Sequence, residues 1–167
     1  ASDWKARDCM IANTYLQDRI LNNSKNPVQD ARIHAMTFYR SPKSLNKRFN
    51  RSFNESKEIY NVESWLDHHA TKLNERFSLK SYKMMNKLLR SADITRGGED
   101  FLKTTSNINS EIHLICVDSD IFFLPEEDKR TFDLLSKTKK QVYLHKINSI
   151  HGHDAFLIET KQISNIF

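Results

Sequence analysis

The hydrophobic period of the chain changes once, near residue 110. Before that point apolar side chains recur at helical spacing, and after it they alternate as in strands. The first part predicts helices over 3–22, 28–40, 62–77 and 82–89, a short helix opened by Ser41-Pro42, a loop over 50–61, a break over 91–98 and a short helix near 99–105. The second part predicts strand 111–117, helix 126–137, strand 141–147 and helix 154–166. The expected fold class is therefore α/β, with an all-helical segment first and a β-α-β-α segment second.

The composition is typical of one globular domain. A chain of 167 residues with 38% hydrophobic and 28% charged residues can bury a single ordinary core. No apolar run is long enough to span a bilayer or resembles a signal peptide, so we expect a cytoplasmic protein that does not bind membranes. The net charge of +5 is dispersed among acids, which favours solvated faces over a nucleic-acid surface.

The two cysteines, Cys9 and Cys116, do not indicate a disulfide framework. Cys116 lies within an apolar run, so we expect it to be a reduced core residue and not a nucleophile.

An acid and a histidine each follow a predicted strand. Asp118-Ser119-Asp120 comes directly after strand 111–117, and Gly152-His153 follows strand 141–147. Open α/β sheets build their sites at the carboxyl ends of the strands, so these side chains are candidates for one site. In the α/β-hydrolase order of nucleophile, acid and histidine, Asp120 and His153 fit the last two places, and the first is empty. The spacing alone fits equally well a loop histidine and a turn aspartate that share no role.

A metal site is the other reading of the histidine loop. His151-Gly152-His153-Asp154 opens like a His-x-His metallohydrolase motif. That motif requires an Asp-His pair two residues beyond its second histidine, where this chain has Ala155-Phe156. We therefore expect no metal there, and His68-His69, on different faces of a helix, would chelate poorly.

Short motifs spread over nearly the whole chain carry a resemblance to a known family. They are Asp30-Ala31-Arg32, Thr37-Phe38-Tyr39-Arg40-Ser41, Arg48-Phe49, Val62-Glu63-Ser64-Trp65-Leu66, Arg76-Phe77 with Ser81-Tyr82, Asp118-Ser119-Asp120, and Gly152-His153-Asp154-Ala155-Phe156-Leu157. In this order they resemble the homoserine O-acetyltransferases, α/β-hydrolase-fold enzymes of methionine biosynthesis. Ser78 and His68-His69 depart from the family's usual Asp and Tyr-Gln, which loosens the expected substrate but not the fold.

The resemblance implies the C-terminal part of an α/β-hydrolase fold. Residues 1–105 would be the helical lid segment, which the family inserts after the sixth strand of its sheet. Residues 106–167 would be the C-terminal β-α-β-α part of the core. The serine nucleophile and the oxyanion donors would lie outside this chain, so we expect this stretch alone to be inactive.

The implied activity is acetyl transfer from acetyl-CoA to L-homoserine, an acyltransferase reaction that uses acetyl-CoA as co-substrate and no cofactor. The alternatives are a related α/β-hydrolase acyltransferase or esterase acting on another substrate, and a non-catalytic helical interaction module. The apolar stripes of the helical segment are interpreted as core or as the face of a homodimer formed through the lid.

The same resemblance implies roles for five residues. His153 would be the general base, and Asp120 would fix its tautomer. Arg32 and Tyr39, seven positions apart and so on one helical face, would hold the substrate, with Asp154 taking its ammonium group. Without the resemblance these last three would be interpreted as a solvated arginine, a core tyrosine and a helix-capping aspartate.

Overall fold

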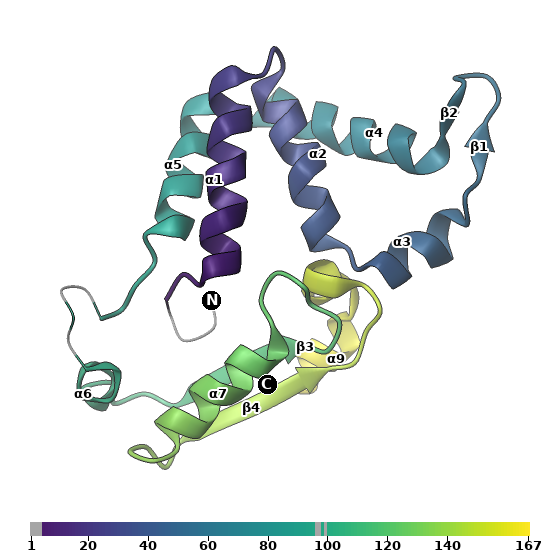
Figure 1. The fold of residues 1–167 in the computed structure, drawn as a ribbon. Helices are drawn as coiled ribbons and strands as arrows, with labels where there is room; N and C mark the ends of the chain where they lie inside the picture. The colour runs from purple at the N-terminus through teal and green to yellow at the C-terminus, as the bar shows by residue number, and fades with distance from the viewer. Residues whose placement is uncertain (1–4, 96–97, 99) are drawn as a thin grey trace.

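The computed structural model describes residues 5–95, 98 and 100–167, and within them it arranges helices above a small sheet (Figure 1). The helical layer contains α1 (Asp8–Asn23), α2 (Pro27–Tyr39), α3 (Pro42–Phe49), α4 (Asn61–Arg76) and α5 (Leu79–Arg90). A hairpin of β1 (Phe53–Asn54) and β2 (Ile59–Tyr60) joins α3 to α4, and α6 (Phe101–Ser106) leads to the sheet. The lower part contains β3 (Ile112–Val117), α7 (Pro125–Leu135), β4 (Val142–Ile147), a 3-10 turn (Gly152–Asp154), α8 (Ala155–Ile158) and α9 (Thr160–Ser164).

The helical layer is held together by polar as well as apolar contacts. Helix α2 packs against α1 and α4, and α1 packs against α5. The buried Gln17 donates from Nε2 to the carbonyl of Ala31 at 3.1 Å, which ties α1 to α2. The buried Asn86 donates from Nδ2 to the carbonyl of Thr14 at 2.8 Å, which ties α5 to α1. Because a buried amide without a partner is costly, these bonds fix how the helices sit on one another.

Strands β3 and β4 pair in parallel, in register from Ile112 opposite Val142 to Val117 opposite Ile147. The crossover between them is α7, whose Pro125 stands in its first turn with three acids after it. Helix α7 packs on the two strands, and Leu135 is fully buried against Ile112 and Val142. Both strands therefore end at the same edge, which brings the Asp118–Asp120 turn beside the loop after β4.

Two expectations from the sequence are wrong in detail. The stretch 50–61, expected to be a loop, contains the β1–β2 hairpin, in which the rings of Phe53 and Tyr60 pack edge to face at 5.3 Å. Each strand has only two residues, and Asn50, Arg51 and Glu58 adopt positive φ, so no strand periodicity was present in the sequence to find.

The single helix expected over 154–166 is broken into the 3-10 turn, α8 and α9. Glu159 has φ −86° and ψ 47°, outside the helical region. Beyond it, the Gln162 side chain accepts from the backbone N–H of Asn148 and donates to its carbonyl, both at 3.0 Å. These bonds tie α9 back to the end of β4, and α8 does not continue into it.

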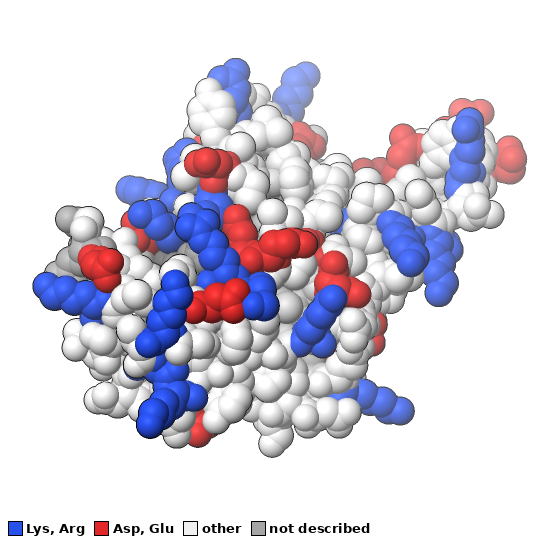
Figure 2. Space-filling model, turned by 60° about the horizontal axis from the view of Figure 1, so that its bottom comes forward, with Lys and Arg blue, Asp and Glu red and all other residues white. Residues whose placement is uncertain are grey.

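The other predicted elements are present, with ends shifted by a few residues. The first helix begins at Asp8, and residues 3 and 4 of its expected span lie outside the described residues, as do 96, 97 and 99 of the expected break and short helix. The boundary between lid and core at residue 105 stays a prediction. Across the described ranges no helix has the length and apolar character needed to cross a membrane. Figure 2 shows lysines and arginines interspersed with acids on the face that it presents.

Candidate active site

Asp120 and His153 meet where the two strands end. Nδ1 of His153 lies 2.9 Å from Oδ2 of Asp120. The other oxygen of Asp120, Oδ1, accepts the backbone N–H groups of Phe122 at 2.8 Å and Phe123 at 3.0 Å. A carboxylate can only accept, so Nδ1 of His153 carries the hydrogen and Nε2 is left as the proton-accepting nitrogen. Asp120 is only 7% exposed, and its carboxylate is held in place by the turn that follows β3.

The other two residues of the acid turn position the histidine loop. The exposed Asp118 accepts the backbone N–H of Ser149 at 2.9 Å, and the Ser119 hydroxyl oxygen accepts that of Gly152 at 2.9 Å. Asp118, two residues before Asp120 in the same turn, therefore bonds to backbone and not to the imidazole. Of these two acids, only Asp120 bonds to His153.

Gly152 lies where the histidine loop rests on the corner between α2 and α3. Its φ is +68°, and a Cβ at this position would lie 2.7 Å from the backbone nitrogen of Ser41 and 3.2 Å from the carbonyl oxygen of Tyr39. The Ser41 hydroxyl accepts from the N–H of Ser44, as an N-cap of α3, and donates to the carbonyl of Ile150. The corner of the helical layer and the loop that carries His153 are thus in direct backbone contact.

Replacing Gly152 with alanine is expected to destabilise the fold by more than about 1 kcal/mol, because alanine disfavours positive φ and its methyl group would clash with backbone that cannot rotate away. Chemical denaturation of the full-length protein measures this change in the free energy of unfolding. Gly98→Ala is the matched control, since Gly98 also has positive φ (+86°) but has no atom within 4 Å of its added Cβ. An equal loss in both variants would contradict the role of the close contact.

Aromatic rings surround the imidazole of His153. The ring centroids of Phe123, Tyr39 and Phe156 lie 4.8, 5.4 and 5.7 Å away. His153 lines two cavities, of about 260 and 340 Å³. The first opens toward the helical layer and is lined by Asn13, Gln17, Tyr39, Tyr82, Met85, Asn86, Leu89, Phe122, Phe123 and His153. A small molecule in that cavity would therefore lie between the helices and the side chain of His153.

Of the three residues expected to bind substrate, two lie together. The guanidinium carbon of Arg32 stands 5.4 Å from the centroid of the Tyr39 ring, and its Nε is buried without a hydrogen-bond partner among the described residues. Burial raises the pKa of the Tyr39 hydroxyl. Tyr39 thus lies close to both Arg32 and His153, and Arg32 keeps one unsatisfied donor.

Asp154, the third, pairs instead with an arginine that the sequence reasoning did not single out. Oδ2 of Asp154 lies 3.9 Å from Nε of Arg40. Burial raises the pKa of the Asp154 carboxyl, and the charges of Arg40 and then Arg32 oppose that shift. Arg40 stood within the Thr-Phe-Tyr-Arg-Ser motif, but nothing in its spacing predicted that it would be buried.

The two loop histidines do not converge on a metal. Nδ1 of His151 lies 2.9 Å from the hydroxyl of Ser44, whereas His153 bonds to Asp120. His69 packs edge to face on Trp65 at 4.6 Å. No group of three or more His, Cys, Asp or Glu side chains that could hold a metal ion occurs in the described part of the chain.

Solved structures show the class of fold to which this arrangement belongs. A homoserine O-acetyltransferase from Bacillus anthracis superimposes with a TM-score of 0.80 at 16% identity, over 96% of this chain and 49% of that one. An acetylester hydrolase from Corynebacterium glutamicum gives 0.77 at 14% identity, over 97% and 50%. The chain has the fold of part of an α/β-hydrolase, as its sequence predicted.

Sequence comparison gives the particular relatives. No known family profile matches the chain. Curated homoserine O-acetyltransferases do, with 33% identity over 144 residues for Salinibacter ruber (84% of this chain, 40% of the relative) and 31% over 136 residues for Trichormus variabilis (81% and 36%). The chain is a homologue of the homoserine O-acetyltransferases, which confirms the resemblance found in its motifs, and it spans about two fifths of the length of these relatives.

Proposed function

We propose that the protein to which this chain belongs transfers an acetyl group from acetyl-CoA to the hydroxyl of L-homoserine. The observation that carries the proposal is the hydrogen bond of 2.9 Å between Asp120 and His153 at the strand ends of an α/β-hydrolase fold. The curated relatives named homoserine O-acetyltransferase support the choice of reaction.

In this mechanism His153 is the proton carrier of a two-step acyl transfer. Its Nε2 accepts the proton of a serine hydroxyl, which we expect outside this chain, as the serine oxygen attacks the thioester. The proton passes to the CoA sulfur as the C–S bond breaks, which leaves an acetyl-serine. His153 then accepts the proton of the homoserine hydroxyl as that oxygen attacks the acetyl-serine, and it returns the proton to the serine oxygen. Asp120 stabilises the imidazolium form in both steps, and no cofactor is needed.

The substrate would be held by its two charged ends. We assign the homoserine carboxylate to Arg32 with Tyr39, because the unsatisfied Nε of Arg32 is buried close to the tyrosine ring. We assign the ammonium group to Asp154, which adjoins His153 in the chain. Asp154 already forms an ion pair with Arg40, so the ammonium group would share the Asp154 carboxylate with that arginine.

An esterase is the second candidate, because structures of esterases resemble the chain as closely as the acetyltransferases do. Esterase E22 superimposes with a TM-score of 0.75 over 96% of this chain at 11% identity. In an esterase, water would take the place of the homoserine hydroxyl. A non-catalytic helical module is less well supported, since such a module has no need of the buried Asp120–His153 pair.

The assay that separates these candidates measures CoA release from acetyl-CoA by the full-length protein, with and without L-homoserine, and identifies the product by mass. We expect release to depend on homoserine and to yield the O-acetyl ester, and the present chain alone to show no turnover. Release that is independent of homoserine would favour the esterase. No release by the full-length protein would overturn the enzymatic proposal.

We also propose a cytoplasmic homodimer that forms through the helical layer. Large apolar side chains are exposed on α1 and α5, namely Ile11, Tyr15, Leu16, Met84, Met85 and Leu88. A second copy would cover this surface. Equilibrium sedimentation of the full-length protein tests it, and a monomer at micromolar concentration would contradict it.

A further inference from the structure

Arg40 is buried with part of its hydrogen-bonding capacity unused. The residue is 8% exposed, and Nη1 has no hydrogen-bond partner among the described residues. Its nearest acid, Asp154, lies 3.9 Å from Nε on the other side of the guanidinium group. Burial lowers the pKa of Arg40, as expected for a cation that its surroundings do not fully compensate. A buried guanidinium N–H group without an acceptor is costly, and an anion in an adjoining cavity would satisfy it.

Arg40 borders a cavity that is rich in positive charge. The cavity has a volume of about 340 Å³ and is lined by Arg40, Ser44, Lys47, Arg48, Ile150 and His151. Three of these side chains are permanently cationic, and no carboxylate is among them. Ser44 and His151 are hydrogen-bonded to each other at 2.9 Å, which places two further polar groups on the wall. This combination suits an anion with several oxygens, for which arginine is the preferred partner.

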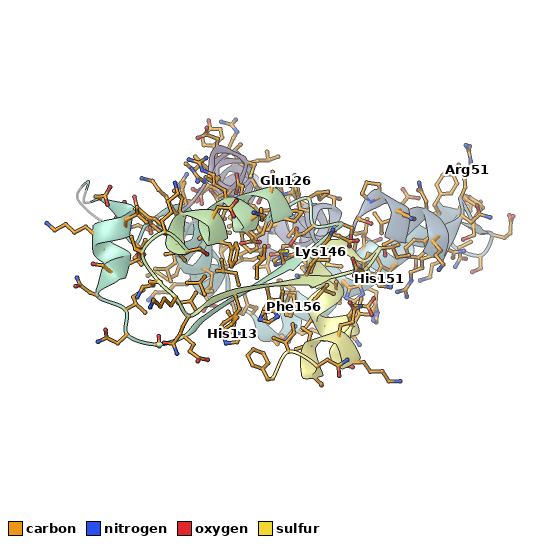
Figure 3. All side chains as sticks on the ribbon, turned by 90° about the horizontal axis from the view of Figure 1, so that it is seen from below. Arg51, His113, Glu126, Lys146, His151 and Phe156 are labelled. Carbon is orange, nitrogen blue, oxygen red and sulfur yellow. The ribbon has the colours of Figure 1, made fainter. Side chains whose placement is uncertain are left out.

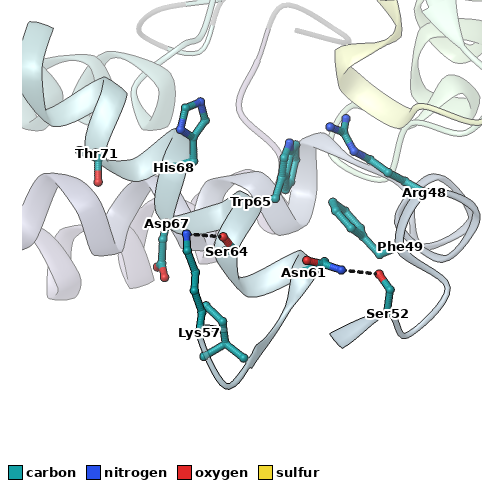
Figure 4. A pocket seen from close by; sticks show the side chains of 11 residues that line it. Arg48, Phe49, Ser52, Lys57, Asn61, Ser64, Trp65, Asp67, His68 and Thr71 are labelled. Atoms are coloured by element: carbon teal, nitrogen blue, oxygen red, sulfur yellow. Dashed lines mark hydrogen bonds between the residues drawn. The ribbon is translucent and has the colours of Figure 1, made fainter. Parts of the chain in front are cut away.

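A larger cavity with an aromatic wall adjoins the first through Arg48. It has a volume of about 810 Å³ and lies between α3, the hairpin and α4 (Figure 4). The guanidinium carbons of Arg48 and Arg40 stand 5.3 and 5.9 Å from the Trp65 ring, and the ring of Phe49 lies 5.6 Å from Trp65. Lys57 also lines this cavity, whereas its one acid, Asp67, lies on the side away from Arg48. A planar ring bound here would have an aromatic partner close to the cationic cavity.

We propose that the Arg40 cavity binds a phosphate group of the acyl donor and that the Trp65 cavity receives its purine ring. The proposal rests on the proposed function, in which the donor is acetyl-CoA, a thioester whose far end is a phosphorylated adenosine. The site is separate from the cavities that His153 lines, since neither the Arg40 cavity nor the Trp65 cavity includes His153. It is nevertheless close to Asp120 and His153, because Arg40 contacts Asp154, the residue after His153. In the view of Figure 3, His151 lies between Phe156 and Arg51.

A phosphate fits the Arg40 cavity better than the homoserine carboxylate does. A carboxylate brings one negative charge and two oxygens, which are too few to pair with three cations. A phosphate brings up to two negative charges and three free oxygens, enough for Arg40, Lys47 and Arg48 together. The positions of the charges thus assign the two substrates to different sites.

The test measures binding of adenosine 3′,5′-bisphosphate, a fragment of the nucleotide end of CoA that has no thiol, to the full-length protein by calorimetry. Lys47→Ala and Arg48→Ala are each expected to weaken binding by about tenfold or more, the scale for losing a hydrogen bond to a charged group. Arg40→Lys, which keeps the charge and removes the forked donor, should weaken it too. Lys43→Ala is the matched control, since Lys43 is an exposed lysine of α3 that lines neither cavity, and it should leave binding unchanged.

Kinetics with a donor that lacks the nucleotide complete the test. S-acetyl-N-acetylcysteamine replaces acetyl-CoA as the donor without a nucleotide. The Arg48→Ala variant should lose less kcat/KM with this donor than with acetyl-CoA. The ratio of kcat/KM for acetyl-CoA to kcat/KM for the short donor should therefore be about tenfold lower in the variant than in the unmodified protein. Equal losses with both donors, or nucleotide binding that none of the three variants weakens, would overturn the inference. Nucleotide binding that depends on Arg48 in a protein that does not acetylate homoserine would leave the site standing and reject the proposed function.

Discussion

Asp120→Asn and His153→Ala are each expected to lower kcat of the full-length enzyme by about a thousandfold or more. In the proposed mechanism, replacing His153 removes the group that carries the proton in both steps. Asparagine at 120 would present an amide in place of the carboxylate that accepts from Nδ1, so the imidazole loses its tautomer and the stabilisation of its charged form. Steady-state CoA release measures the effect, and circular dichroism checks that the fold survives.

Asp118→Asn is the matched control for the acid, because it makes the same chemical change two residues away in the same turn. Asp118 is exposed and accepts a hydrogen bond from the backbone of Ser149. Asp118→Asn should therefore lower kcat much less than Asp120→Asn does. If Asp118→Asn proves the damaging change and Asp120→Asn the mild one, the assignment of the catalytic acid is wrong. Equal effects of both would indicate that the turn acts only by holding the loop.

Arg32→Leu is expected to raise the KM for homoserine and to lower kcat/KM by a factor that corresponds to about 2–4 kcal/mol of lost transition-state stabilisation. This loss is somewhat above the usual range for a hydrogen bond to a charged group, because the site is buried. Leucine keeps much of the side-chain volume over Tyr39 but offers no donor to a carboxylate. The measurement is the initial rate of CoA release across a range of homoserine concentrations at saturating acetyl-CoA. Arg19→Leu, at an exposed position of α1, is the control for removing a positive charge from the helical layer.

Acetylation of the enzyme itself separates the two substrates in this variant. Without homoserine, mixing the full-length enzyme with acetyl-CoA should still give a burst of CoA release in Arg32→Leu, because the serine step does not involve the homoserine carboxylate. If the burst is lost while homoserine binding is unchanged, then Arg32 serves the acyl donor or the fold, and the substrate assignment fails.

Periodicity predicted the long elements because each is amphipathic over several turns or fully paired. Helix α4 carries Val62, Leu66 and Leu73 on one stripe, and β3 and β4 are apolar runs bounded by polar turns. Short elements carry too few repeats for a period to show, which is why the β1–β2 hairpin was missed. The break at Glu159 depends on Gln162 bonding to Asn148, a contact between distant residues that no local pattern contains.

The candidate site, like the fold, could be predicted from the sequence only in part. Asp120 and His153 could be paired because strand ends and a short motif agreed on the same two residues. The partner of Asp154 could not be predicted, since Arg40 reaches it only once α2 and the histidine loop are packed together. The roles of Arg32, Tyr39 and Asp154 in binding homoserine stay predictions.

The backbone contact at Gly152 also limits how the helical layer can move. Ser41 caps the N-terminus of α3, and its hydroxyl donates to the carbonyl of Ile150. Gly152 packs closely against the backbone nitrogen of Ser41. Any rotation of the α2–α3 corner away from the sheet would therefore pull on the loop that carries His153 and separate it from Asp120. Opening motions that keep the catalytic pair intact must pivot about this corner as a fixed point, with the displacement growing toward the far ends of α2 and α3. If the protein is the acetyltransferase that we propose, substrates would enter by movement of the outer helices, with Asp120 and His153 kept together.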